Sequence, residues 1–247
     1  MSLFKEMLYK KSKRIKKHIK KIIKSIDKNV LFSIGENCLA DDVLARNGLK
    51  SFSSPYASSR SNIEYLLDFE NENFKDILNP EWLVYENSSG NKVARNKKYV
   101  DVNNKYHSSC INGFEFTHHD VIGDNAMTDT IRKRCRRLMK LHNKNIVMLY
   151  HHRYCQETDE KLLLKNLTEL AELYKARKNQ VHIYMFTQVI VPTEAERKTE
   201  HLVNNGINVY KFYTLNVWGG EDADILWARC DNDLLQEMID DINTKLV

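Results

Sequence analysis

The sequence is poor in residues that interrupt or cross-link a fold. It has only 3 Pro and 8 Gly in 247 residues, which excludes a collagen-like or low-complexity chain. Its 5 cysteines are scattered and form no Cys-x-x-Cys pair, which favours reduced thiols in a cytoplasmic protein over disulfides or a zinc site. No run of about 18 apolar residues is present, and the N-terminus lacks the apolar stretch of a secretory signal.

Positive charge is concentrated in the first segment. The formal net charge is +5, but residues 1–28 hold eleven Lys or Arg against two acids, which is +9 and leaves −4 for residues 29–247. The isoleucines of this segment recur at helical spacing, so residues 3–27 are predicted to form a basic amphipathic helical arm. Such an arm suits the inner face of the cytoplasmic membrane or an anionic polymer, or packs on its own domain. No nucleic-acid-binding motif is present, so no nucleic-acid partner is expected.

The stretch 29–45 has the pattern of a buried strand, a sharp turn and a helix. Val30, Leu31 and Phe32 form an apolar run, Gly35 permits a tight turn, and apolar residues then follow at helical spacing. Enzymes with parallel sheets place nucleophiles at such corners, because a helix N-terminus offers free N–H groups. Two candidate nucleophiles lie here, Ser33 and Cys38.

The pattern of the remaining sequence predicts an α/β domain over 29–247, with a mostly parallel sheet flanked by helices. Strand and helix patterns alternate from residue 143 onward, which favours right-handed parallel crossovers. Strands are expected at 145–150, 181–191 and 207–212. Helices are expected at 159–177, 193–205 and 231–245, and a small β-excursion at 82–104.

Polar residues near predicted strand ends and loops are the candidate ligand contacts. His152 and Arg153 follow the strand at 145–150, where ligands bind in α/β proteins. Arg60 and Asn62 belong to a serine-rich loop, in which Arg60 could bind an anion. The cluster at 118–120, His-His-Asp, has no matched ligand elsewhere, so it indicates a structural or substrate contact and no metal is expected.

A serine nucleophile needs a histidine base, and the pattern does not supply one. The late loop, at the position expected for a base and its acid, contains Asp222 and Asp224, but the last histidine is His201, in a predicted helix. Residue pattern alone therefore leaves Ser33 without a partner.

Four stretches together resemble bacterial capsule-locus proteins of the capsule polysaccharide O-acetyltransferase type. They are 33–38, 50–56, 60–63 and 113–120. The resemblance implies an α/β-hydrolase-like fold, acetyl-CoA as donor, and transfer through an acetyl-Ser33 enzyme. The implied acceptor is a hydroxyl of N-acetylmannosamine in an anionic, phosphodiester-linked capsular polysaccharide.

The same resemblance implies a catalytic triad. Asp222 or Asp224 would orient a histidine at position 228, and Gln188, with Gln156 as the alternative, would hold the acid. The chain has Ala228 there, which would make it an inactive form.

A more distant similarity, to sequences labelled papain-like cysteine peptidases, favours Cys38 as nucleophile instead. The alternatives to acetyl transfer are therefore a Cys38-dependent thiol hydrolase or peptidase, and a non-catalytic capsule-assembly or membrane-surface adaptor acting through residues 3–27.

Overall fold

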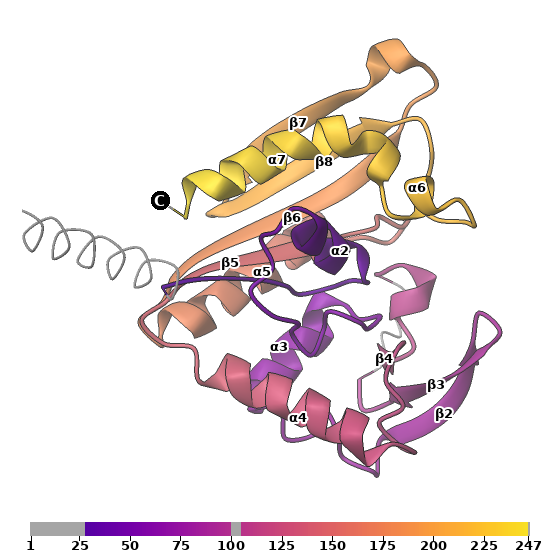
Figure 1. The fold of residues 1–247 in the computed structure, drawn as a ribbon, viewed down its shortest axis with the longest axis vertical. Coiled ribbons are helices and arrows are strands. Elements are labelled where there is room, and N and C mark those ends of the chain that lie inside the picture. The colour runs from indigo at the N-terminus through magenta and orange to yellow at the C-terminus, as the bar shows by residue number, and fades with distance from the viewer. Residues whose placement is uncertain (1–27, 100–104, 247) are drawn as a thin grey trace, which may run out of the picture.

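The computed structural model describes residues 28–99 and 105–246, and the predicted arm at 3–27 lies outside them. Its main element is a five-stranded sheet in the order β1-β5-β6-β8-β7 (Figure 1). The first four strands are parallel and β7 is antiparallel. The strands are β1 (Asn29–Ser33), β5 (Asn145–His151), β6 (Gln180–Ile190), β8 (Ile207–Thr214) and β7 (Lys198–Asn204).

Helices cover both faces of this sheet (Figure 1). The apolar cluster on one face includes α2 (Leu39–Arg46) and α7 (Asn232–Thr244). The cluster on the other face includes α3 (Ile63–Asn71), α4 (Asn125–Met139) and α5 (Glu160–Lys175). Buried residues of the four parallel strands are divided between these two clusters, which is why these strands have continuous apolar sequences. The predicted mixed α/β fold, with a mostly parallel sheet flanked by helices, is confirmed.

A smaller antiparallel sheet adjoins the α3 and α4 side. Its strands are β2 (Leu83–Ser88), β3 (Asn91–Asn96) and β4 (Phe114–Phe116), in that order. The first two form a hairpin inside the range 82–104, where the sequence indicated a β-excursion. Arg60 forms a β-bridge with Glu115 of β4, so the serine-rich loop is joined to this sheet.

The prediction of a helix at 193–205 is wrong. The segment forms a short 3₁₀ turn, Glu194–Glu196, followed by β7, which pairs antiparallel with β8. Asn205 and Gly206 have φ values of 51° and 80°, the left-handed angles of a two-residue hairpin turn. An Asn-Gly pair can end a helix or form the turn of a hairpin, and the sequence analysis interpreted this pair as the end of a helix.

No helix in the described ranges is long and apolar enough to cross a bilayer.

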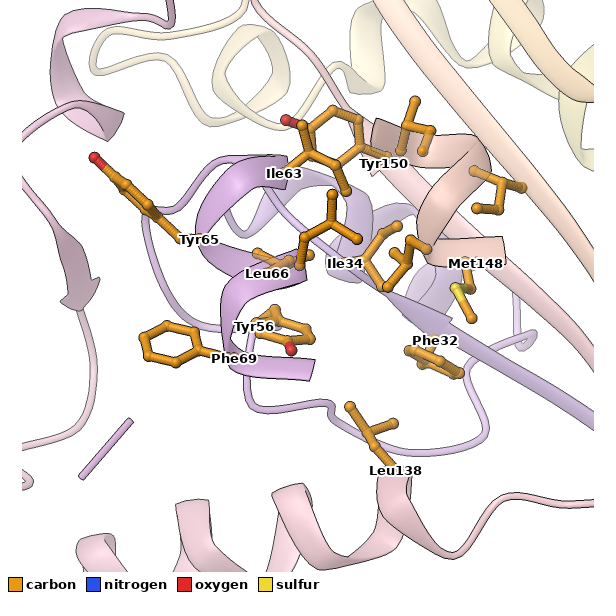
Figure 2. Close-up of a cluster of buried hydrophobic side chains, with 14 of the residues drawn as sticks. Phe32, Ile34, Tyr56, Ile63, Tyr65, Leu66, Phe69, Leu138, Met148 and Tyr150 are labelled. Carbon is orange, nitrogen blue, oxygen red and sulfur yellow. The ribbon is translucent and has the colours of Figure 1, made fainter. Parts of the chain in front are cut away.

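A buried carboxyl group lies next to Tyr56, one of the aromatic residues of the apolar cluster that Figure 2 shows. Glu70 of α3 is 2 % exposed, and its Oε1 accepts hydrogen bonds from the Tyr174 hydroxyl at 2.6 Å and the Tyr56 hydroxyl at 3.4 Å. The Arg177 guanidinium is 3.7 Å from its Oε2. Burial raises the pKa of Glu70 from 4.5 to about 7, against the opposing effect of these partners.

We predict that this group makes the protein less stable as pH rises. Between pH 4.5 and about 7 the folded state binds the Glu70 proton more tightly than the unfolded state, so unfolding free energy falls across that window, by about 3 kcal/mol. Glu70→Gln keeps an acceptor oxygen and should remove this decline. Urea denaturation at a series of pH values measures it, with the exposed Glu169→Gln as control. Parallel pH curves for wild type and Glu70→Gln would contradict the prediction.

Candidate active site at the carboxyl edge of the sheet

A cleft opens where the parallel strands end. Its volume is about 200 Å³. Its walls come from the ends of β5 and β6, from the loop after β8 and from one residue before β4. The lining residues are His107, His151, His152, Arg153, Tyr154, Gln188, Ile190, Val217 and Trp218. Ligands of parallel α/β sheets bind at this edge, and three predicted site residues, His152, Arg153 and Gln188, meet here.

A buried carboxylate joins the ends of β1 and β5 beneath this cleft. Glu36 has no exposed surface, and its Oε2 accepts hydrogen bonds from the backbone N–H and the Nε of Arg153, at 3.2 and 3.3 Å. Its Oε1 lies 3.0 Å from Nδ1 of His152. Burial opposes ionisation of Glu36, but His152 and Arg153 outweigh it and lower its pKa. Removing one partner of such a pair typically costs about 3–5 kcal/mol.

Glu36 and its neighbours hold Arg153 at the cleft wall. The Arg153 Nη2 donates to the Ser109 hydroxyl at 2.8 Å and approaches the Cys110 sulfur at 3.4 Å. Its Nη1 has no partner among the described residues, so one end of a fixed guanidinium is free to bind a ligand.

A second polar pair lies next to this network. The Asn37 Oδ1 accepts the Leu39 backbone N–H at 3.0 Å and lies 3.2 Å from Nδ1 of His151. Because that oxygen acts as an acceptor, Nδ1 of His151 carries the ring proton and Nε2 is left as a free base. Nε2 is buried and has no hydrogen-bond partner among the described residues. Burial, and then the Arg153 charge, lower the pKa of His151 to about 3, so its ring is neutral.

Aromatic rings fix the plane of this histidine. The His151 ring stacks on Phe186 of β6 with centroids 4.8 Å apart and an interplanar angle of 21°. Trp218, after β8, covers it at 5.8 Å. The Gln188 side chain keeps Trp218 in place, because its Oε1 accepts the Trp218 backbone N–H at 3.0 Å. Its Nε2 donates to Thr214 Oγ1 at 2.5 Å and to the carbonyl of Asn216 at 2.7 Å.

Cys38 follows Asn37 directly and is the N-cap residue of α2. Its side chain is partly buried, and it makes no hydrogen bond to a histidine in the described part of the chain. Burial and then the Asp41 carboxylate raise the pKa of the Cys38 thiol above its usual value of 9.0, while Arg60 acts in the opposite direction. The thiol is therefore protonated at neutral pH.

No hydrogen bond or ion pair in the described residues joins Ser33 to Asp222, to Asp224 or to position 228, as the predicted acetyl transfer would require. Ser33 is fully buried, and its hydroxyl donates to Asp41 at 3.1 Å. Asp222 caps the short helix α6 (Ala223–Leu226), and Asp224 is exposed on it. Ala228 is fully buried in the apolar cluster of α2 and α7, with a left-handed φ of 54°.

The two predicted contacts of the serine-rich loop are not among the residues that line the cleft. Arg60 lies with its Nε 3.6 Å from Glu115 and donates from Nη1 to Ser88. Asn62 caps α3, accepting the Tyr65 backbone N–H at 3.1 Å and donating to the carbonyl of Cys110 at 2.9 Å.

His118 and His119 line a second cavity of about 310 Å³ beside the smaller sheet. Asp120, which lines the same cavity, accepts the Tyr85 hydroxyl at 2.8 Å and the Gly123 backbone N–H at 2.8 Å. Within the described residues, no group of three or more His, Cys, Asp or Glu side chains could hold a metal ion.

Sequence reasoning missed four residues of the cleft region: Glu36, Asn37, His151 and Trp218. His151 had a usable signal, since it ends the buried strand that precedes His152. Glu36 and Asn37 lie three and four residues after the end of β1, but only the β1–β5 pairing shows that they face the end of β5. Trp218 reaches the cleft because Gln188 holds its loop.

Residues 29–194 match the model of a protein family, more than half of the 247 residues. The chain belongs to this family, which is described as "Putative papain-like cysteine peptidase". The match includes β1, α2, β5 and β6 and ends before β7. No curated protein and no solved structure matches the chain.

This family membership corrects the expected resemblance to capsule O-acetyltransferases. No acetyltransferase family is indicated, so the predicted acetyl transfer from acetyl-CoA to a capsular polysaccharide is wrong. The inference that Ala228 replaces a catalytic histidine rested on that resemblance and no longer has a basis. Asp222, Asp224 and Ala228 also lie beyond the matched segment. The more distant similarity, which favoured Cys38, agrees with the family that matches.

The environment of Cys38 predicts slow alkylation at neutral pH. Iodoacetamide reacts with the thiolate, so labelling of Cys38 should accelerate as pH rises past 9. Asp41→Asn removes the carboxylate that raises this pKa and should speed labelling at pH 7.5 by about 3- to 10-fold. Peptide mass mapping separates Cys38 from the other four cysteines. Asp42→Asn is the matched control, because Asp42 pairs with Arg46. Equal rates in both variants would contradict the assignment.

Proposed function

We propose that the chain is a Cys38-dependent thiol hydrolase that cleaves peptide or related acyl bonds. The observation that carries the proposal is the Asn37–His151 contact directly beside Cys38. Cysteine, histidine and asparagine are the functional set of papain-like proteases. Here Asn37 and Cys38 lie between β1 and α2, and His151 ends β5, the parallel strand next to β1, all within the segment that matches the family.

Exposure favours Cys38 over Ser33 as the nucleophile. The Ser33 hydroxyl is fully buried and already donates to Asp41, whereas Cys38 is partly accessible at the N-cap position of α2. A nucleophile between a parallel strand and a helix is also the arrangement of α/β-hydrolase corners. The proposed likeness to α/β-hydrolases is limited to this strand-turn-helix segment and does not extend to the whole fold.

The proposed reaction has two steps. Cys38 Sγ attacks the carbonyl carbon while its proton passes to Nε2 of His151, and the amine leaves with that proton. Water then attacks the thioester, giving its proton to Nε2, and the acid product and the thiol are released. Asn37 keeps Nε2 as the basic nitrogen throughout, because it holds the proton on Nδ1. Cys38 and His151 make no hydrogen bond to each other in the described residues, and Cys38 is not among the residues that line the cleft. The proposed reaction therefore requires that the thiol and the imidazole come together when substrate binds, as catalytic hydrogen bonds commonly do.

The resting state differs from a preformed ion pair. The thiol pKa is raised and the His151 pKa is lowered to about 3, so both groups are neutral at pH 7. His151 then acts as a general base at the moment of attack. Because its pKa of about 3 lies well below the operating pH, its contribution should lie at the low end of the about 10²–10⁴ that is typical of general bases.

Substitution of the two groups tests the proposal. Hydrolysis of p-nitrophenyl acetate and of fluorescein-labelled casein should fall at least about 10³-fold in Cys38→Ala and about 10²- to 10³-fold in His151→Gln. Cys230→Ala changes an exposed cysteine outside the cleft and should retain full activity. Activity that survives in Cys38→Ala, or is absent from wild type on both substrates, would refute the assignment.

The pH profile of hydrolysis tests whether Cys38 and His151 are both uncharged in the resting protein. A histidine with a folded-state pKa of about 3 remains a base well below the usual imidazole pKa of 6.5. The kcat/KM of hydrolysis should therefore show no acidic limb near pH 6.5 and should decline only below about pH 4. A limb centred near 6.5 would instead identify another histidine as the base.

A further inference from the structure

β6 extends past its neighbour β5 at the carboxyl edge of the sheet. β5 pairs with β6 as far as His151, opposite Phe186, and the His152 N–H donates to the Phe186 carbonyl at 2.9 Å. The Arg153 N–H then donates to Glu36, so the chain turns away toward the end of β1. β6 continues to Ile190 and from this point pairs only with β8.

The extra residues present unused backbone groups to the position that β5 leaves. Along a strand, N–H and C=O groups point alternately to the two neighbours. Val191 donates to the Thr214 carbonyl of β8 at 2.9 Å, whereas Phe186 faces β5, so Gln188 and Ile190 also face the β5 side. No hydrogen bond from the described residues reaches their N–H or C=O groups there. Such an unpaired edge is a template for another strand.

The cleft occupies the place where β5 would have continued. Gln188 and Ile190 line one side of it, and Arg153 and Tyr154 line the other. Its rim is apolar, because Ile190 is 47 % and Val217 is 66 % exposed. The free Nη1 of Arg153 adds a positive charge to this wall, and the buried Nε2 of His151 faces no partner in the described chain.

We propose that an extended peptide containing an acidic residue binds by adding a strand to the free edge of β6. Its backbone pairs with Gln188 and Ile190, its apolar side chains contact the rim, and its carboxylate binds Arg153. This inference rests on the proposed function in naming that peptide as the substrate of Cys38.

Amide hydrogen exchange tests the docking without catalysis. In Cys38→Ala protein the amides of Gln188 and Ile190 should exchange fast, and the peptide acetyl-Val-Asp-Val-Thr-amide should slow both at least 10-fold. The Val189 amide faces β8 and should be slow with and without peptide. Peptide that fails to bind at millimolar concentration, or that binds without protecting these two amides, overturns the proposal.

Two substitutions at one position separate backbone from side chain. Ile190→Pro removes the N–H that faces the cleft and breaks no hydrogen bond of the described fold, so it should raise the peptide Kd by about 5- to 10-fold. Ile190→Ala keeps the N–H and should raise it less than 3-fold. Equal effects of the two would overturn the pairing.

The proposed contact between the peptide carboxylate and Arg153 is tested by one substitution in the peptide and one in the protein. Replacing Asp by Asn in the peptide should weaken binding to wild type several-fold and should have no effect on Arg153→Gln. An equal loss in both proteins excludes Arg153 as the contact and overturns that part of the proposal.

The outcomes also separate this inference from the hydrolase proposal. If the two amides are protected but the wild-type protein hydrolyses neither substrate, the peptide-binding proposal is supported and the hydrolase proposal is refuted. If hydrolysis depends on Cys38 but the two amides are not protected, the hydrolase proposal is supported and the peptide-binding proposal is refuted.

Discussion

The contact on which the site depends is the buried one between Glu36 and Arg153. It ties the residues that follow β1 to those that follow β5, with a carboxylate that has no access to water. A charge in that position is tolerated only because several donors surround it. The same contact turns the chain away from β6, so one interaction fixes the guanidinium and leaves the end of β6 unpaired.

The polar groups above that contact form two connected sets. Asn37 sets the ring proton of His151, and Gln188 holds the loop that brings Trp218 over the same ring. Both sets are built from backbone-anchored side chains at strand ends. The imidazole therefore has a defined tautomer, a defined plane and a single unused nitrogen, which is the arrangement that a general base requires.

Local pattern predicted much of the fold and only part of the site. The strand-turn-helix at 29–45 and the helix at 159–177 have unmistakable apolar periodicity, and both are present as β1, α2 and α5. The Asn205-Gly206 pair was ambiguous, because the left-handed angles it adopts end helices and turn hairpins alike. The Asn37–His151 contact spans 114 residues and exists only because β1 pairs with β5, which no local pattern specifies. Glu36 was overlooked because charged residues are usually exposed.

The end of the family match at residue 194 divides the cleft. The wall that carries His151, Arg153 and the β6 edge lies inside the shared segment, while Val217 and Trp218 come from the part of the chain beyond it. The two walls are joined by hydrogen bonds of the Gln188 amide and by contacts of the Trp218 ring with His151 and Phe186. A change in the loop at 215–218 would therefore reshape one wall of the cleft and also alter the cover over the His151 ring, whereas in the described part of the chain Glu36 and Arg153 make no hydrogen bond to that loop.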